Sequence, residues 1–248
     1  MNGVNGHMGQ VITQITQKDP EIELVAGIDP FDGIKNPFPV FPTLDQCDVP
    51  ADVVIDFSNA SGIDRLLDDC VKKKLPLVLC TTGLSDSTLD HVQKASENIA
   101  VLRSANMSLG INTLMDLLKK ATAVFADAGY DIEIIEQHHN QKLDAPSGTA
   151  IALADAVNEA HGGDYDYVYD RSHRREKRNA REIGISSVRG GNIVGIHEVL
   201  FCGEDEVITF RHQATSKSVF AKGAVEAAKF LADVPAGMYD MSDVIAAK

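Results

Sequence analysis

The chain has 248 residues, of which 44% are hydrophobic and 24% charged, and its formal net charge is −13. These values indicate a globular protein of one large or two modest domains, and the negative charge argues against nucleic acid as a partner. No apolar run approaches the roughly 20 residues of a membrane helix, so we expect no membrane partner. The four scattered cysteines form neither a zinc pattern nor a disulfide ladder, so we expect free thiols, no metal site and a cytoplasmic location.

The first 105 residues alternate between predicted helices and strands. Met8, Val11, Ile12 and Ile15 have the spacing of an amphipathic helix. Strands are predicted at residues 21–28, 51–57, 75–80 and 99–102, and helical stretches such as residues 64–73 separate them. This alternation predicts a Rossmann-like, doubly wound parallel α/β sheet.

A glycine-rich turn at residues 3–9 precedes the first predicted helix, and Asp29 follows 20 residues after Gly9. Such a turn lets a pyrophosphate approach the backbone at a helix N-terminus, and the later carboxylate binds the adenosine ribose. Residues 81–82 and 104–107 follow the third and fourth strands, where ligands gather, although ordinary turn chemistry would also place them there. The candidate dinucleotide ligands are Gly3, Val4, Asn5, Gly6, His7, Met8, Asp29, Thr81, Thr82, Ser104, Ala105, Asn106 and Met107.

The residues around Asp29 favour NADH over NADPH. A carboxylate would repel a 2′-phosphate, and Pro30-Phe31 provides no arginine to bind one. Lys35 is near enough in sequence to keep NADPH open.

Only Met1-Asn2 precede Gly3, where a Rossmann domain has its first strand. Either further residues come before those given or the central strand is truncated. Truncation would weaken both the sheet and the cofactor cradle.

The second half of the chain has a different pattern. A helix is predicted at residues 108–127, a strand at 131–137, a helix from about 150, β-rich segments at 183–185, 192–201 and 206–213, and a last helix near 224–231. We therefore expect a dinucleotide-binding domain at 1–106 and 217–248. Residues 107–216 should form an α+β domain whose mixed or antiparallel sheet binds substrate and mediates oligomerisation.

Residues 138–150 (HHNQKLDAPSGTA) combine two imidazoles, an ammonium group and a helix start. Histidine exchanges protons near neutral pH, and free N–H groups at a helix start bind anions. Strand alternation places His138 on the face of Ile132 and Ile134, and His139 on the other face. The motif predicts a site where a small acidic substrate is protonated. Taken singly, each residue has a structural alternative, such as Ser147 or Thr149 as a helix cap.

A basic segment at residues 171–181 is conspicuous in so acidic a chain. It is either a solvated loop or helix face, or a positive wall that steers an anionic ligand.

Together these residues resemble the 4-hydroxy-tetrahydrodipicolinate reductase family, also called dihydrodipicolinate reductase. The resemblance covers essentially the whole chain. The matching motifs are Gly3-x-x-Gly6-x-Met8-Gly9, Asp56-Phe57-Ser58, Thr81-Thr82-Gly83, Asn106-x-Ser108-x-Gly110-x-Asn112, Glu136-x-His138-His139-x-x-Lys142-x-Asp144 to Ala150, Ile185 to Gly191 with His197, and Phe220-Ala221-x-Gly223-Ala224.

The resemblance implies NAD(P)H-dependent reduction of a cyclic dicarboxylate to tetrahydrodipicolinate in diaminopimelate and lysine biosynthesis. It implies that His138 and Lys142 donate protons, and that a homotetramer forms. The implied substrate ligands are His139, Gly148 and Thr149, with Ser147 in the same carboxylate cradle. Residues 80–82 and 104–107 would surround the nicotinamide. Cys80 stands where the family usually has glycine, and Lys217 where arginine is common, which keeps the charge but loses a bidentate grip.

Two other functions compete with this one. The first is another NAD(P)-dependent amino-acid or semialdehyde dehydrogenase, but a semialdehyde enzyme would need a catalytic cysteine, and none lies near residues 138–149. The second is a nucleotide sensor without activity, which should have lost His138 or Lys142.

Overall fold

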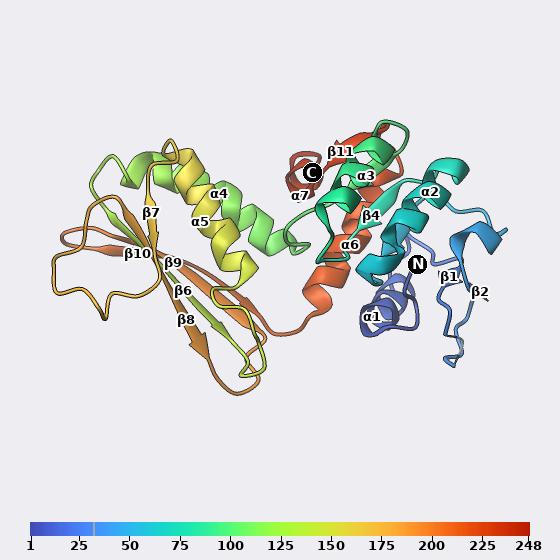
Figure 1. Cartoon of the computed structure of the whole chain (residues 1–248), viewed down its shortest axis with the longest axis horizontal. Coiled ribbons are helices and arrows are strands. Elements are labelled where there is room, and N and C mark those ends of the chain that lie inside the picture. Colours follow the sequence, from blue (N-terminus) through green and yellow to red (C-terminus); the bar gives the residue numbers. More distant parts are fainter. Residues whose placement is uncertain (32) are drawn as a thin grey trace. The chain divides into compact units, whose positions relative to one another are not determined.

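The computed structural model describes residues 1–31 and 33–248, which divide into two compact units (Figure 1). Unit 1 comprises Met1–Leu109 and Ser218–Lys248, and unit 2 comprises Gly110–Lys217. Unit 2 is thus inserted into unit 1. Among the described residues, no helix has the length and apolar character needed to cross a bilayer.

Unit 1 is built on a parallel sheet. Its strands are β1 Gly27–Ile28, β2 Val40–Phe41, β3 Val54–Asp56, β4 Leu77–Leu79, β5 Ala100–Leu102 and β11 Gly237–Tyr239. Its helices are α1 His7–Thr16, α2 Ile63–Lys73, α3 Asp86–Ser96, α6 Ser218–Leu231 and α7 Met241–Ala246, with short 3₁₀ turns at Leu44–Gln46 and Ala60–Gly62. Asn2 bridges Ile28 and Asp56 in the parallel sense, which gives the order β2-β1-Asn2-β3-β4-β5-β11.

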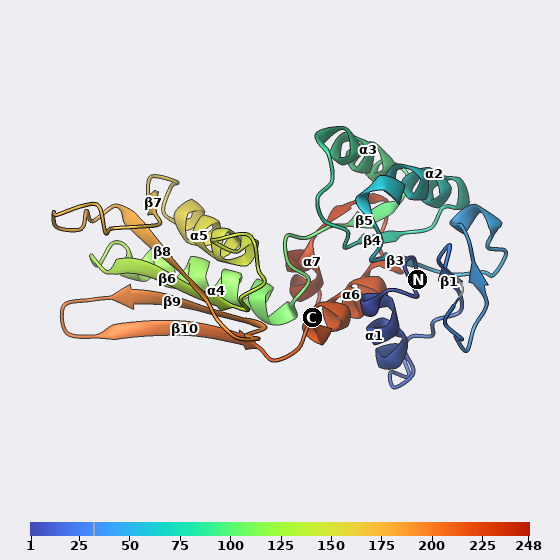
Figure 2. The same cartoon turned by 60° about the horizontal axis from the view of Figure 1, so that its bottom comes forward.

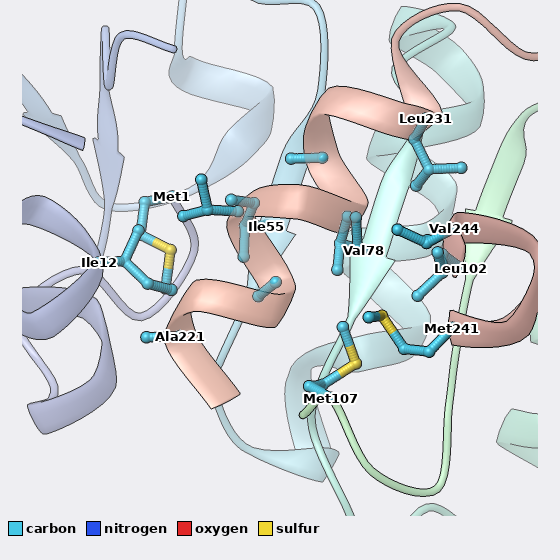
Figure 3. Close-up of a cluster of buried hydrophobic side chains, with 14 of the residues drawn as sticks. Met1, Ile12, Ile55, Val78, Leu102, Met107, Ala221, Leu231, Met241 and Val244 are labelled. Carbon is cyan, nitrogen blue, oxygen red and sulfur yellow. The ribbon is translucent and has the colours of Figure 1, made fainter. Parts of the chain in front are cut away.

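Side chains alternate between the two faces of this sheet, and helices cover both faces. Val78 and Leu102 pack with α1, α6 and α7 in one apolar cluster (Figure 3). Leu77 and Leu79 pack with α2 and α3 in a second cluster on the other face. Helices on both faces of a parallel sheet confirm the doubly wound architecture that the sequence predicts.

Met1 and Asn2 occupy the central position of the sheet, between β1 and β3. Asn2 donates its backbone N–H to the Ile55 carbonyl and accepts from the Phe57 N–H, while the Met1 nitrogen donates to the Ala26 carbonyl. The expected strand at residues 21–28 was wrong in length, because β1 contains only Gly27–Ile28. The pairing with Met1 ends at Ala26, and a cavity lined by Leu24 and Val53 among other residues lies beyond it.

Unit 2 has one mixed sheet covered by two helices. Its strands are β6 Asp131–His138, β7 Asp166–Val168, β8 Glu182–Arg189, β9 Gly195–Cys202 and β10 Val207–Ala214, in the order β10-β9-β6-β8-β7. Strands β6, β7 and β8 are parallel, whereas β9 runs antiparallel to β6 and β10. The helices α4 Leu109–Phe125 and α5 Gly148–Ala160 cover one face (Figure 2). The predicted mixed sheet is therefore confirmed.

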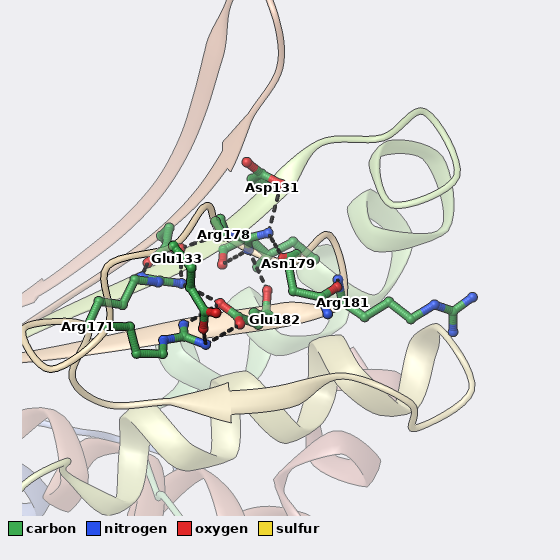
Figure 4. A network of polar contacts seen from close by, with 10 residues as sticks. Asp131, Glu133, Arg171, Arg178, Asn179, Arg181 and Glu182 are labelled. Carbon is green, nitrogen blue, oxygen red and sulfur yellow. Dashed lines mark hydrogen bonds and ion pairs between the residues drawn. The ribbon is translucent and has the colours of Figure 1, made fainter.

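The basic segment is bound to acidic residues near the first residues of β6 and β8 (Figure 4). Arg171 donates two hydrogen bonds to Glu133, at 3.0 and 2.8 Å, and Arg174 donates two to Glu182, at 2.8 and 2.9 Å. Arg178 contacts Glu133 and Asp131 as well. These three arginines hold a loop on the sheet. This role differs from both expectations for the segment, a solvated loop or helix face and a positive wall that steers an anionic ligand.

Glu182 should make the fold sensitive to acid. Hydrogen bonds from Arg174, and also from Arg171, lower its pKa from 4.5 to about 2. A lowered pKa in the folded state adds stability that is fully present above 4.5 and is lost as the pH falls towards 2. We expect Glu182→Gln to lower the urea midpoint at pH 7, with a smaller difference from the parent at pH 3. The exposed Glu176 also faces Arg174, at 3.5 Å, so Glu176→Gln is the control. Equal midpoints for the two variants would contradict this prediction.

Candidate functional site

The glycine turn of unit 1 has no space for side chains at two of its positions. Gly3 has φ +75°, and a Cβ there would lie 2.4 Å from the Phe57 carbonyl oxygen. A Cβ on Gly9 would lie 2.4 Å from the Gly3 oxygen. Helix α1 begins at His7, directly after Gly6. The sequence therefore folds into a bare backbone turn at a helix start, as a pyrophosphate site requires.

Asp29 lies beside this turn. One carboxylate oxygen accepts the backbone N–H of Asn5 at 3.0 Å, and the other accepts that of Phe31 at 3.0 Å. Because Asp29 follows β1 directly, its carboxylate is held at the carboxyl end of the sheet. The structure thus brings the predicted turn and the predicted ribose ligand together, and their geometry fits a dinucleotide.

The buried carboxylate of Asp56 connects three neighbouring positions of the sheet through hydrogen bonds. It accepts hydrogen bonds from Asn2 (2.7 Å), Ser58 (2.6 Å) and Thr81 (2.6 Å). The Thr81 hydroxyl is therefore bound within the protein, whereas Thr82 is exposed. Burial, together with Asp56, raises the pKa of the Cys80 thiol well above 9.0, so this cysteine is not a ready nucleophile.

The loop after β5 is held by helix α6. A Cβ on Gly223 would lie only 1.6 Å from the Met107 carbonyl oxygen, so the helix and the loop are in direct backbone contact. The Met107 side chain packs in the core (Figure 3), and the Asn106 side chain accepts the Ser108 N–H at 2.8 Å. Ser104 is half-buried and Ala105 exposed. Because the Met107 side chain is buried in the core, only the backbone of Met107 is placed to contact a ligand.

In unit 2, His138 lies at the end of β6 on the face of Ile132 and Ile134, which confirms the alternation argument. Its Nδ1 is 2.6 Å from a carboxylate oxygen of Glu136, which is completely buried. Arg189 donates two hydrogen bonds to the same carboxylate, at 2.8 and 2.7 Å. Burial raises the pKa of Glu136, but the hydrogen bonds from Arg189 and His138 outweigh it and lower this pKa to about 2. Glu136 is therefore ionised.

Ser147 caps α5 by accepting the Ala150 N–H at 3.2 Å. Its hydroxyl also lies 3.0 Å from Nε2 of His197, and its own N–H donates to Glu136 at 3.1 Å. Burial, aided by the neighbouring His138, lowers the pKa of His197 to about 4, so its imidazole is neutral at pH 7. The rings of His138 and His197 are 5.1 Å apart.

The loop between β6 and α5 carries the remaining predicted residues. The Lys142 ammonium group lies 2.8 Å from the Asp144 carboxylate. The backbone N–H of Lys142 donates to the His139 carbonyl. His139 and Thr149 are half-buried, and Gly148 is exposed with open space where a Cβ would be. Unit 2 thus places a histidine bound to a carboxylate, a lysine and a capped helix start on consecutive segments.

Four site residues lie outside the predicted set of ligands and catalysts: Asp56, Glu136, Arg189 and His197. All four lie within the motifs that carry the resemblance, but the sequence does not show which side chains they contact. Glu136 and Arg189 are 53 residues apart, and only the β6–β8 pairing makes them neighbours.

Comparison with known proteins covers both units. The chain matches the family models described as the N-terminus of dihydrodipicolinate reductase, over residues 1–107, and its C-terminus, over residues 110–245. It is 48% identical to the 4-hydroxy-tetrahydrodipicolinate reductase of Caldanaerobacter subterraneus subsp. tengcongensis, over 99% of this chain and 96% of the relative. It is 47% identical to the Clostridium tetani enzyme of the same name, over 96% and 93% of the two chains.

A solved structure is also similar over nearly the whole chain. The dipicolinate-bound dihydrodipicolinate reductase from Paenisporosarcina sp. TG-14 has a TM-score of 0.80 and is 26% identical, with 96% of this chain and 95% of that chain covered. The family models and the relatives lead to the same assignment. The chain belongs to the dihydrodipicolinate reductase family.

Proposed function

We propose that this chain reduces 4-hydroxy-tetrahydrodipicolinate to tetrahydrodipicolinate and water, with NADH or NADPH, in diaminopimelate and lysine biosynthesis. Family membership over both units supports the reaction. At the level of residues, the single observation that carries it is His138 on an ionised buried carboxylate, followed on the next loop by Lys142. This pair suits a reaction that adds protons to an anionic ring.

Unit 1 is the proposed dinucleotide-binding domain. The bound cofactor supplies the hydride. Residues 3–8 would hold its pyrophosphate and Asp29 its ribose, while the nicotinamide would meet Cys80, Thr81, Thr82 and residues 104–107. The bare glycine turn and the adjacent carboxylate support this assignment.

Unit 2 is the proposed substrate-binding domain. His138 and Lys142 would hold the protons that the reduced ring receives, and both lie within the segment 138–142. The substrate carboxylates would bind His139, Ser147, Gly148 and Thr149, since backbone N–H groups at the start of α5 favour anions. The dipicolinate carried by the Paenisporosarcina structure is a small dicarboxylate of this kind.

NADH is the proposed preferred cofactor. The carboxylate of Asp29 stands at the turn, and it would repel a 2′-phosphate. Lys35 is exposed six residues further along the chain. Fluorescence titration with each cofactor tests the preference, and a lower Kd for NADPH would contradict it.

The open face of the unit 2 sheet is the proposed interface of a homotetramer. Val188 and Val207 on β8 and β10 are 45% and 57% exposed, and β10 is an edge strand. Apolar side chains and a free edge in a sheet are usually covered in the working protein. Sedimentation equilibrium gives the subunit number directly.

We also propose a cytoplasmic location, which the free cysteines support.

The reaction is tested by supplying the protein with NADH and the condensation product of pyruvate and aspartate semialdehyde. We expect NADH to be consumed and tetrahydrodipicolinate to form. A protein that binds NADH but consumes none above background would contradict the proposal. Reduction of NAD⁺ by an amino acid or a semialdehyde would instead identify another dehydrogenase.

A further inference from the structure

The Glu136 carboxylate collects donors from three segments of unit 2. They are His138 on its own strand, Arg189 at the end of β8, and the backbone N–H of Ser147 at the start of α5. Arg189 also donates to the Asp144 carbonyl at 2.7 Å, so the same pair holds the loop that carries Lys142. A completely buried charge is retained at such a place only where it is fully hydrogen-bonded, as Glu136 is.

This contact decides which nitrogen of His138 carries a proton. An ionised carboxylate can only accept hydrogen bonds, so Nδ1, at 2.6 Å, must be the donor. Because Nδ1–H is fixed in this way, Nε2 is the nitrogen that gains and loses a proton.

Nε2 lies beside Gly195, which has no side chain. A Cβ on Gly195 would lie 3.1 Å from Nε2 and 3.5 Å from the ring carbon beside it. A contact of 3.1 Å is tighter than about nine in ten contacts that real Cβ atoms make, so the imidazole would have to move. The absent side chain at the first residue of β9 therefore leaves room beside the exchanging nitrogen.

We propose that Glu136, held by Arg189, is a positioning residue that keeps His138 in the Nδ1-protonated tautomer and leaves Nε2 as the nitrogen that donates the proton. The catalytic part of this statement rests on the proposed function, whereas the tautomer does not. Aspartate or glutamate bound to a histidine controls catalytic imidazoles in the same manner in hydrolytic triads.

The charges around His138 fix the direction of the pH effect. Burial lowers its pKa below 6.5, Lys142 and Arg189 lower it further, and only Glu136 raises it. His197 on β9 is the other titratable group that packs against the ring, and it is neutral at pH 7. A proton donor is active below its pKa and inactive above it. Removing the Glu136 charge should therefore move the loss of kcat/KM to lower pH.

The tautomer can be observed in the unaltered protein. In the full-length chain labelled with ¹⁵N-histidine, at a pH above the His138 pKa, we expect a protonated-type Nδ1 signal and an unprotonated-type Nε2 signal. His138→Gln assigns the signals by their loss. The reverse pattern, with the proton on Nε2, would overturn the proposal whether or not the protein is active.

The variant test compares Glu136→Gln with Glu133→Gln. Glu133 lies on the same strand and accepts two hydrogen bonds from Arg171, but it contacts no histidine in the described part of the chain. We expect Glu136→Gln to lower kcat by roughly 10- to 10⁴-fold, with a smaller change in KM and a pH profile shifted to lower pH. Glu133→Gln should lose stability but keep the parent kcat and pH profile.

The remaining outcomes separate the tautomer from the reaction. In a His138→Gln background, Glu136→Gln should cost little further activity, because it acts through His138. Equal losses in both backgrounds, or an unshifted pH profile, would overturn the positioning role. Full activity of His138→Gln with the expected tautomer in the parent would contradict the proposed catalytic function instead. If Glu136→Gln fails to fold, Arg189→Lys gives the same comparison, because it removes the bidentate grip on Glu136.

Discussion

Lys142→Met is expected to lower kcat by about 10²- to 10⁴-fold, the range that a positioned proton donor contributes. Methionine keeps most of the length of the side chain but cannot donate a proton or offset the negative charge that develops on the ring. Asp144 lies 2.8 Å from the ammonium group, so the lysine is held rather than freely mobile. The affinity for NADH should change little, because the cofactor is assigned to the other unit. Steady-state kinetics and an NADH titration measure the two quantities.

Lys177→Met is the matched control, since this lysine is exposed in the same unit and lies outside the predicted site. It should keep the parent kcat. Equal losses of kcat and NADH affinity in Lys142→Met would point to a structural role for the lysine. A kcat within the range of the control would remove Lys142 from the mechanism.

Gly3→Ala should weaken NADH binding by about tenfold or more and also destabilise unit 1. A left-handed backbone costs a residue with a Cβ about 1–2 kcal/mol. Here the Cβ would in addition lie 2.4 Å from the Phe57 carbonyl oxygen, and such overpacking typically costs about 1–3 kcal/mol. A backbone shift that relieves this contact moves the turn that would receive the pyrophosphate, and about 1.4 kcal/mol is enough for a tenfold change in Kd. An NADH titration and a urea midpoint measure both effects.

Gly129→Ala separates the two causes. Gly129 has φ +83°, close to that of Gly3, but a Cβ there meets no atom within 4 Å. This control should lose only the cost of the left-handed backbone and bind NADH as the parent does. If Gly3→Ala behaved like Gly129→Ala, the close approach to Phe57 would have no part in cofactor binding.

Local patterns predicted the longer helices and strands of both units, but not the short elements β2, β7, β11 and α7. The spacing of Met8, Val11 and Ile12 corresponds to α1, and alternation along β6 placed His138 on the buried face. These patterns succeed because helix and strand periodicities depend only on near neighbours in the sequence. Strand lengths were less accurate. Residues 21–26 are as apolar as a strand needs, but strand structure also requires a paired neighbour, and the Met1 pairing ends at Ala26.

The sequence alone determined the two-part α/β plan, the glycine turn with Asp29, and the motif from His138 to Thr149. It could not determine which side chains meet across the sheets. Register pairs His138 with Arg189 and Glu136 with His197, and the carboxyl ends of neighbouring strands bring Asn2, Ser58 and Thr81 to Asp56. Register follows from how a whole sheet packs against its helices, so no local pattern contains it. For this reason the position of His138 on the buried face was predictable, while the buried carboxylate of Glu136 that contacts it became visible only in the tertiary structure.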